Sequence, residues 1–460
     1  MSKGLVESVP NEARAAFRKL LRGGSWAFFG RLLTYPLGLF VTLILAKLLT
    51  TAEMGGYFLV MSTVMVASSL VRLGLDTTMC KVIALSLAEN NPLGARKAIR
   101  IGFIAFAIAG AVALAVFSSE LGRWLFGNVQ GGQQLFGVLI YVAGMIVLFS
   151  WTGYSCEILR GFNDLRSAAI LDQQTLQRLL LLLSLVAGIG LGIVLDLTDV
   201  LKLAVAAMSV PAILGMYFVL RKRSTLGQYG ESIQTRNVLR HAPTFLLVRL
   251  SNWVFDGAAI WVLSTSQALE EAALYGAANA LALLTLAPAQ VVNTAISPTV
   301  VALNARNQLD DLSTVLRAAA VFAILPAVLM SIVLIFFGEI ALTLLFTEEY
   351  RSATSLLLLL AIGRTASMFF GLPLVLLSMT HHQDVVFRVL IVTSALTLFG
   401  YIYAAANFGA IGVAAVGAGS IVLQGLVLSI IAKRLLGVNT LPEFSIQAWK
   451  TLFKQLKHQK

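Results

Sequence analysis

The sequence predicts an all-α polytopic membrane protein with about 12 transmembrane helices, and three observations lead to this fold class. Of the 460 residues, 58% are hydrophobic and only 12% are charged, with a mean hydropathy of +0.86. Apolar runs recur along the chain, each near the ~20 residues that a helix needs to cross a hydrocarbon core of about 30 Å. The runs are continuous rather than alternating, which favours helices over the strands of a membrane barrel.

The predicted spans form two groups of six. The first group lies near residues 25–49, 55–76, 98–117, 135–158, 174–195 and 200–220, and the second near 242–264, 273–297, 318–338, 354–378, 385–406 and 409–432. The predicted domains are a cytoplasmic amphipathic leader (1–24), an N-lobe (25–220), a cytoplasmic inter-lobe loop (221–241), a C-lobe (242–432) and a basic cytoplasmic amphipathic tail (433–460). We expect the tail to lie on the anionic inner face of the membrane.

The basic residues are distributed unequally between the two sides of this arrangement. Of 34 lysines and arginines, 25 fall on the side that holds both termini, whereas the opposite side has only Lys47, Arg123, Lys202 and Arg351. Cytoplasmic loops carry an excess of lysine and arginine, so both termini are predicted to be cytoplasmic. This topology also accounts for most of the net charge of +12, and nucleic acid is not expected as a partner.

The two halves show a faint internal repeat. An offset of 218 residues aligns Arg31 with Arg249 and Tyr57 with Tyr275, and each tyrosine lies beside a glycine. Together with six spans in each half, the repeat favours a duplicated architecture. The halves then run in the same orientation around a central cavity.

Five arginines, Arg31, Arg72, Arg178, Arg249 and Arg364, lie inside the predicted spans. An ionisable group at bilayer depth costs ~2.5 to 3.5 kcal/mol on insertion scales, so these side chains must face protein or water. A guanidinium is permanently charged and forks onto phosphate or carboxylate oxygens. A cavity lined with arginine therefore indicates an anionic cargo.

Other polar side chains share helical faces with these arginines. The candidate substrate-binding residues are Arg31 and Tyr35 of the first span, Arg72 of the second, Arg249 and Asn252 of the seventh, Asn279 and Gln290 of the eighth, and Arg364 of the tenth. Two acids in the same spans, Asp76 and Asp256, are candidates for a titrating coupling site.

A structural role is the alternative for part of this set. Arg72 and Asp76 are four residues apart and could pair near the cytoplasmic end of the second span. In the seventh span, "FLLVRLSNWVFDGAAIWVL", Arg249 and Asp256 are separated by ~10 Å of helix rise, which is far for a direct ion pair. Asp256 is then either a structural counter-ion or a coupling site.

Motifs for catalysis are missing from the sequence. The chain contains no phosphate-binding GxxxxGK[ST] loop. The adjacent histidines at 381 and 382 have no further His or Cys nearby at metal-ligand spacing. The sequence therefore predicts a transporter with no catalytic residue, no metal site and no cofactor.

Several segments resemble the polysaccharide transporters, or lipid-linked oligosaccharide (O-antigen type) flippases, of the multidrug/oligosaccharidyl-lipid/polysaccharide exporter superfamily. They are "AKLLTTAEMGGYFLVMS", "LVRLGLDTTMCKVIA", "ILRGFNDLRSAAI", "LSNWVFDGAAIWVLS" with "LYGAANAL", and "LFTEEYRSATSLLLLLA". Their order and spacing carry the resemblance, which covers nearly the whole chain. It implies two six-helix lobes around a V-shaped cavity in the bacterial cytoplasmic (inner) membrane.

The resemblance also implies a function. The protein would move an undecaprenyl-diphosphate-linked oligosaccharide across the membrane by alternating access, for lipopolysaccharide O-antigen or exopolysaccharide biosynthesis. Arg31, Arg249 and Arg364 suit the central cations of the family's cavity, and Asp76 or Asp256 would serve coupling to a proton or sodium gradient. The implied partners are the lipid-linked glycan, membrane lipids and a polysaccharide polymerase with its chain-length machinery.

Two alternatives remain open at this point. A cation-coupled multidrug exporter of the same superfamily would use carboxylates to hold cationic drugs, and the five arginines in the spans argue for an anionic cargo instead. A non-transporting membrane scaffold would leave the buried charges without a purpose.

Overall fold

The computed structural model describes residues 36–127, 137–171, 175–227, 229–230, 242–305, 308–380 and 382–442. The predicted leader, the part of the predicted tail from 443 to 460, and the candidate residues Arg31 and Tyr35 lie outside these residues. Within the described ranges every regular element is helical. The prediction of an all-α fold is therefore confirmed.

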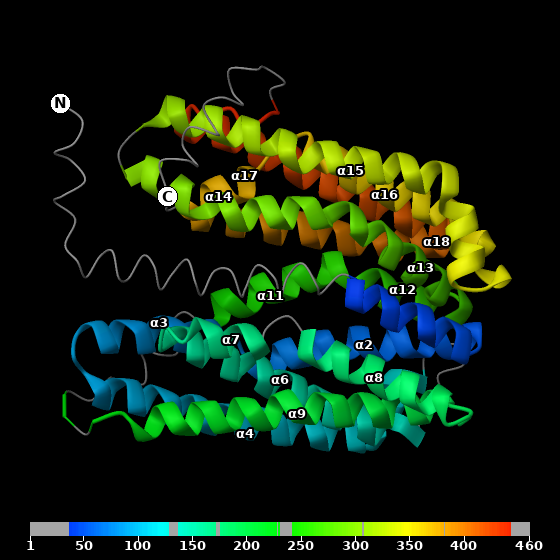
Figure 1. The fold of residues 1–460 in the computed structure, drawn as a ribbon, viewed down its shortest axis with the longest axis horizontal. Helices are drawn as coiled ribbons and strands as arrows, with labels where there is room; N and C mark the ends of the chain where they lie inside the picture. Colours follow the sequence, from blue (N-terminus) through cyan, green and yellow to red (C-terminus); the bar gives the residue numbers. More distant parts are fainter. Residues whose placement is uncertain are drawn as a thin grey trace.

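The first half of the chain forms the N-lobe. Its helices are Pro36–Leu48, α2 (Thr51–Arg72), α3 (Leu75–Ala88), α4 (Pro92–Ser118), α5 (Glu120–Gly127), α6 (Leu139–Gly161), α7 (Leu165–Leu171), α8 (Thr175–Gly190) and α9 (Leu197–Ser224). The C-lobe has α11 (Ala242–Asp256), α12 (Ala258–Ser266), α13 (Leu269–Ala282), η3 (Leu283–Leu286), α14 (Ala287–Ala305), α15 (Leu309–Leu345), η4 (Glu348–Ala353), α16 (Thr354–Met368), α17 (Pro373–Met379) and α18 (Gln383–Leu436). The lobes lie one above the other in Figure 1, with α11 and α12 at their junction.

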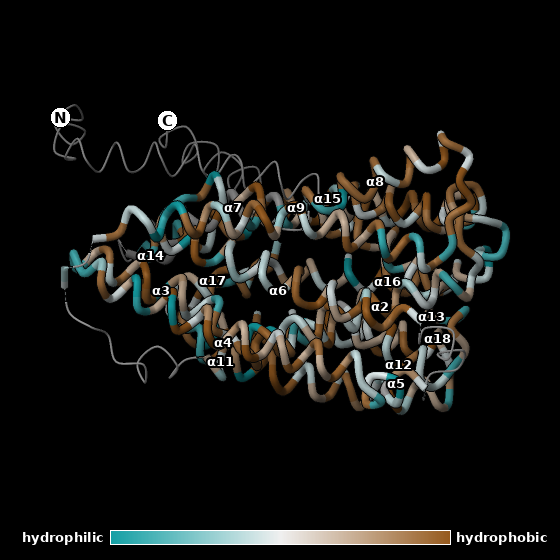
Figure 2. The backbone as a smooth tube through the Cα atoms, turned by 90° about the horizontal axis from the view of Figure 1, so that it is seen from below, coloured by the Kyte–Doolittle hydropathy of each residue, from teal (hydrophilic) through white to brown (hydrophobic). Residues whose placement is uncertain are grey.

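The described helices match the predicted spans in position. Seven are long and apolar enough to cross a membrane, and two bent pairs bring this described set to nine. The shorter helix Pro36–Leu48 and the α7–α8 pair occupy two further predicted spans, and a break at Gly409 (φ 62°, ψ −151°) divides α18 into the last two. Hydrophobic residues dominate the middle of the bundle and hydrophilic ones gather toward its ends (Figure 2).

The second predicted span is not one continuous helix, and here the prediction was wrong. α2 ends at Arg72 and α3 begins at Leu75, because Leu73 (φ 53°) and Gly74 (φ 69°) both adopt the left-handed conformation. The break brings the N-lobe against the C-lobe. A Cβ atom at Gly74 would lie 2.1 Å from the carbonyl oxygen of Ala242 at the start of α11, so only glycine allows this approach.

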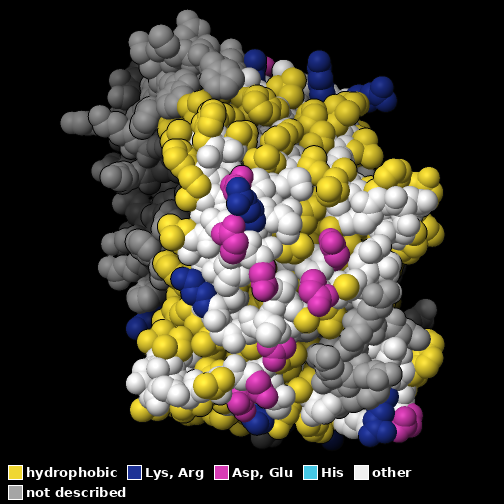
Figure 3. Space-filling model, turned by 90° about the vertical axis from the view of Figure 1, so that its right-hand side faces the viewer, with side chains coloured by type: hydrophobic (Ala, Val, Ile, Leu, Met, Phe, Trp, Pro, Cys, Tyr) yellow, Lys and Arg dark blue, Asp and Glu magenta, His cyan; other side chains and the backbone are white. Residues whose placement is uncertain are grey.

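We name the two ends of the bundle after the predicted orientation. The predicted external end holds the starts of α2 and η4, and the predicted cytoplasmic end holds the α3–α4 and α6–α7 turns. The external end carries exposed acids such as Glu120, Glu270 and Glu348. Figure 3 shows this end with acidic side chains spread across its centre and hydrophobic side chains toward its flanks.

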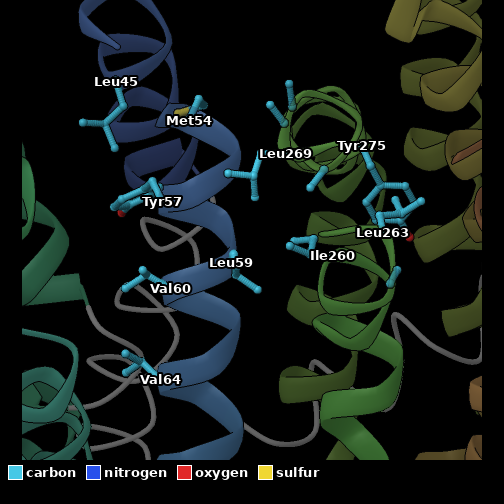
Figure 4. Close-up of a cluster of buried hydrophobic side chains, with 14 of the residues drawn as sticks. Leu45, Met54, Tyr57, Leu59, Val60, Val64, Ile260, Leu263, Leu269 and Tyr275 are labelled. Carbon is cyan, nitrogen blue, oxygen red and sulfur yellow. The ribbon is translucent and has the colours of Figure 1, made fainter. Parts of the chain in front are cut away.

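Among the described residues, most of the hydrophobic packing between the lobes lies at one end. A single buried cluster passes from Val41–Ala67 of the N-lobe through α12 and α13 to α16 and α18 of the C-lobe. Figure 4 shows part of it, with Leu59 of α2 facing α12 and α13. Toward the predicted cytoplasmic end each lobe has its own cluster, around Met79 and Ile158 in the N-lobe and around Leu316 and Leu377 in the C-lobe. The two lobes thus share a large core at the external end, whereas at the other end, of the described C-lobe residues, only Ala242 of α11 joins the N-lobe cluster.

Candidate functional site

A cavity of about 500 Å³ lies in the N-lobe beneath α11. Its walls come from α2, α6, α7, α8 and α9 of the N-lobe and from α11 of the C-lobe. Three arginines, Arg72, Arg160 and Arg249, line it together with one acid, Glu157. The volume is within the ~300 to 1,000 Å³ of small-molecule sites, so it could hold a polar head group but not a long lipid chain.

Two of these arginines share one carboxylate. The Oδ2 atom of Asp76 lies 2.5 Å from a guanidinium nitrogen of Arg249 and 3.4 Å from one of Arg72. Asp76 is fully buried and its other oxygen accepts a hydrogen bond from the backbone N–H of Thr77. The side chain of Arg249 remains 27% exposed. One negative charge thus holds two positive charges, and the group keeps a net charge of +1 at the cavity wall.

The pair of arginines comes from opposite lobes. Arg72 is the last residue of α2, and its guanidinium lies against α6, since a Cβ atom at Gly153 would be 2.5 Å from its Nη1. Arg249 projects from α11 and also donates to the Thr77 hydroxyl at 3.5 Å. The Asp76 carboxylate therefore links the N-lobe to the C-lobe beside the cavity.

A bend in the seventh span sets the position of α11. The segments Ala242–Phe255 and Ala258–Ser266 meet at 59°. Ser62 of α2 donates to the carbonyl oxygen of Gly257 at 2.8 Å, and the Trp253 indole N–H donates to the Ser62 carbonyl at 3.2 Å. The Trp261 indole N–H donates to the Thr63 hydroxyl at 3.2 Å. These bonds satisfy the backbone at the bend and attach α11 and α12 to α2.

One face of α6 forms the opposite wall. Phe149, Gly153, Glu157 and Arg160 recur at helical spacing and all line the cavity. Glu157 and Arg160 form an ion pair at 2.6 Å near the end of α6. The Arg72 guanidinium lies over the Phe149 ring, 5.8 Å from its centroid. The wall therefore runs from the arginine pair toward the predicted cytoplasmic end.

Arg364 is not among the residues that line this cavity. It lies on α16, is 6% exposed, and donates to the Asn279 side-chain oxygen of α13 at 2.5 Å. Its helix packs closely on α18, where a Cβ atom at Gly363 would be 2.3 Å from the Cβ atom of Ala418. Arg364 and Asn279 therefore meet between α16 and α13 of the C-lobe.

The other predicted residues have different outcomes. Arg72, Arg249 and Asn252 line the cavity, and Asp76 lies directly behind it. Gln290 is half-buried on α14 and does not line it. The backbone of Asp256 ends α11 at the bend, but its side chain, like Arg31 and Tyr35, lies outside the described part of the structure. Roles in binding and coupling stay predictions.

The sequence reasoning missed several lining residues: Phe149, Glu157, Arg160, Gln177 and Trp253. Arg160 lies two residues beyond the predicted end of the fourth span at residue 158. The i, i+4, i+8, i+11 spacing of Phe149, Gly153, Glu157 and Arg160 was a usable signal for one helical face. No comparable pattern points to Gln177.

Comparisons with known proteins agree with this architecture. A structure of a multidrug resistance MATE family transporter of the MOP superfamily in an inward-facing conformation is 16% identical and has a TM-score of 0.70, covering 88% of this chain and 94% of that one. The lipid II flippase MurJ in an inward closed conformation is 15% identical with a TM-score of 0.69, covering 95% and 91%. An outward-facing multidrug resistance MATE family transporter of the MOP superfamily is 16% identical and has a TM-score of 0.55, with 90% of this chain and 94% of that chain covered. The similarity shows that the chain has the fold of these two-lobe transporters.

No curated protein sequence matches the chain. The family described as "Polysaccharide biosynthesis protein" matches residues 20–304, which is more than half of the sequence. The helices make the chain a multi-pass membrane protein, and the bacterial inner membrane is the location that goes with this family. The predicted resemblance to polysaccharide transporters is confirmed, and the chain belongs to the polysaccharide biosynthesis protein family.

Proposed function

We propose that this protein is a flippase that moves an undecaprenyl-diphosphate-linked oligosaccharide across the bacterial cytoplasmic membrane for surface or exopolysaccharide biosynthesis. The observation that carries the proposal is the cavity that Arg72, Arg160 and Arg249 line. A lipid diphosphate is the anion that a membrane protein of a polysaccharide family would encounter there, and guanidinium groups bind phosphate oxygens in a bidentate manner. The MurJ structure, that of a lipid II flippase, supports this class of cargo.

The packing of the lobes supports alternating access. The lobes share a large core at the predicted external end and little hydrophobic packing at the other, so a head group would enter from the cytoplasmic side. The TM-score of 0.70 to an inward-facing transporter, against 0.55 to an outward-facing one, agrees with this state. The lipid chain would stay in the membrane while the head group crosses, and no bond is made or broken.

The charge of the cavity distinguishes this cargo from cationic drugs. A cation exporter needs carboxylates facing its cavity, but Glu157 is paired with Arg160 and Asp76 with two arginines. The remaining positive charge would repel a cationic drug. Coupling to protons or sodium ions, and a polysaccharide polymerase as partner, belong to the same proposal.

The proposal predicts that Arg249→Ala abolishes transport. Loss of a charge-assisted hydrogen bond to phosphate, which contributes roughly 1.5 to 3 kcal/mol, should weaken cargo binding about 10- to 100-fold. Arg249→Lys should retain part of the activity, because it keeps the charge and loses the planar fork. The measurement is surface polysaccharide in a strain that lacks its native flippase and expresses each variant at equal membrane abundance.

Arg123→Ala is the matched control. Arg123 is exposed on α5, where it pairs with Glu120 outside the cavity, so its removal should leave surface polysaccharide unchanged. Wild-type levels of surface polysaccharide with Arg249→Ala would show that the cavity arginine does not bind the cargo.

A further inference from the structure

Gln177 lines the cavity from α8 and is only 6% exposed. Within the described residues its carboxamide makes no hydrogen bond. Its amide atoms are not among the fully buried, unpaired polar atoms and so remain accessible from the cavity, where water or a ligand normally satisfies such groups. Since this amide faces a cavity, a ligand is the partner that a transport function would provide.

Asn252 provides a second carboxamide from the C-lobe. It lies three residues after Arg249 on α11, lines the same cavity, and is exposed to it. It too makes no hydrogen bond with any described residue. Trp253 beside it presents its ring to the cavity while its N–H is bound to Ser62, so the ring is fixed in place.

The Glu157–Arg160 ion pair completes this part of the cavity. Arg72 contacts α6 at Gly153, and Arg160 follows seven residues later, which corresponds to about 10 Å of helix rise. The ion pair therefore lies along the cavity from Arg72, toward the predicted cytoplasmic end. It presents carboxylate acceptors and guanidinium donors side by side with almost no net charge.

We infer that these groups form a glycan subsite, made by Gln177, Asn252 and the Glu157–Arg160 pair, which binds the sugar attached to the lipid diphosphate. This inference rests on the proposed function and adds a second recognition element to it. Sugar hydroxyl and N-acetyl groups each donate and accept hydrogen bonds, and a carboxamide does the same. The ligand class is therefore a neutral or N-acetylated sugar, while Arg72 and Arg249 take the phosphates.

The test uses two probes and the purified full-length protein in detergent. The bare probe is a short-chain polyprenyl diphosphate, and the sugar-bearing probe is the same lipid with N-acetylglucosamine on its terminal phosphate. The Kd of each probe is measured for wild type, Gln177→Ala, Asn252→Ala and Arg249→Ala. Comparing the ratio of the two Kd values between variants cancels the effect of the different charge on the two probes.

We expect Gln177→Ala and Asn252→Ala each to weaken the sugar-bearing probe about 3- to 10-fold, the effect of one or two neutral hydrogen bonds, and to change the bare probe less than about twofold. Arg249→Ala should weaken both probes by similar factors. Gln424→Ala is the matched control, because Gln424 is a half-buried glutamine of α18 outside the cavity, and it should change neither Kd.

Two results would overturn the subsite. Gln177→Ala and Asn252→Ala could weaken both probes equally, which would make their effect one on the phosphates or on folding, or they could change neither Kd. Equal Kd values of the wild-type protein for the bare and the sugar-bearing probe would also rule out the subsite. A flippase that recognises only the diphosphate would remain consistent with that result. Failure of wild type to bind either probe would reject the proposed function itself.

Discussion

Asp76 is the residue on which the arginines of the cavity depend. Its carboxylate is fully buried and lies between a guanidinium of each lobe, 2.5 Å from Arg249 and 3.4 Å from Arg72. Two arginines at this depth without a counter-charge would repel each other and lose solvation. The geometry favours the role of counter-ion for Asp76, and a phosphate entering the cavity would compete with it for Arg249.

Asp76→Asn should therefore have two opposite effects. Removing one partner of a buried ion pair costs about 3 kcal/mol or more, so the melting temperature in detergent should fall by several degrees. The affinity for a short-chain polyprenyl diphosphate should rise about 3- to 10-fold, because Arg249 no longer shares its charge with Asp76. Thermal melts and Kd measurements on the same preparations check both effects.

Asp199→Asn controls for the loss of a carboxylate as such. Asp199 pairs with Lys202 at 2.9 Å on an exposed turn of α9. The melting temperature of the Asp199→Asn protein and its Kd for the polyprenyl diphosphate should match those of wild type. Weaker diphosphate binding by Asp76→Asn would contradict competition and would make Asp76 a purely structural support for Arg249.

At the scale of elements, α2 is the helix that joins the lobes. Gly55 of α2 approaches the backbone of α13, where an added Cβ atom would lie 1.9 Å from the Leu269 carbonyl oxygen. At Gly276 of α13 an added Cβ atom would lie 2.4 Å from the Phe58 ring of α2. Thr51 at the start of α2 also donates to Glu349 of η4. Small residues at these positions allow the external end to close.

Gly55→Ala should prevent that close approach. Overpacking of a tight contact costs typically about 1 to 3 kcal/mol, so the melting temperature and the transport of lipid-linked glycan should both fall. Gly144→Ala on α6 is the matched control, because nothing lies within 4 Å of the added Cβ atom and alanine favours the helix by roughly 0.5 to 1 kcal/mol. If Gly55→Ala melts and transports like wild type, then closure does not depend on this contact.

The repeat seen in the sequence is visible at this scale as well. Tyr57 of α2 and Tyr275 of α13 are both buried. Figure 4 shows Tyr57 on the side of α2 that faces away from α13, and Tyr275 on the side of α13 that faces away from α2. Each tyrosine thus points into its own lobe, as duplicated halves require.

The breaks in the helices could not be predicted from the sequence, because hydropathy does not register a local change such as the positive φ of Leu73.

At the scale of the whole molecule, the orientation in the membrane is a prediction from charge. The positive-inside rule places the α3–α4 turn in the cytoplasm and α5 outside. In a background without the native Cys80 and Cys156, a Glu120→Cys variant should react with a membrane-impermeant maleimide in spheroplasts. A Glu89→Cys variant should react only after lysis.

The two positions form a matched pair, since both are exposed and α4 alone separates them. The reverse labelling pattern would invert the orientation, and the cavity would then face the external side. Labelling of both variants in spheroplasts would mean that α4 does not cross the membrane.

Several properties followed from the sequence alone. Long apolar runs must become helices in a bilayer, because every backbone group has to be hydrogen-bonded within its own segment, and this specified the fold class and the span positions. Arg72, Arg249 and Asn252 were identified because polar groups at bilayer depth are costly and must face protein or water. These are properties of single helices, and a sequence records them directly.

Only the tertiary structure decided which polar groups meet. It joined Arg249 to Asp76, which is 173 positions earlier in the chain, and placed Arg364 with Asn279 in another part of the molecule. It also brought Gln177, Glu157 and Arg160 to the same cavity. Such pairings depend on how helices rotate and pack against one another, and hydropathy along one chain does not specify that rotation.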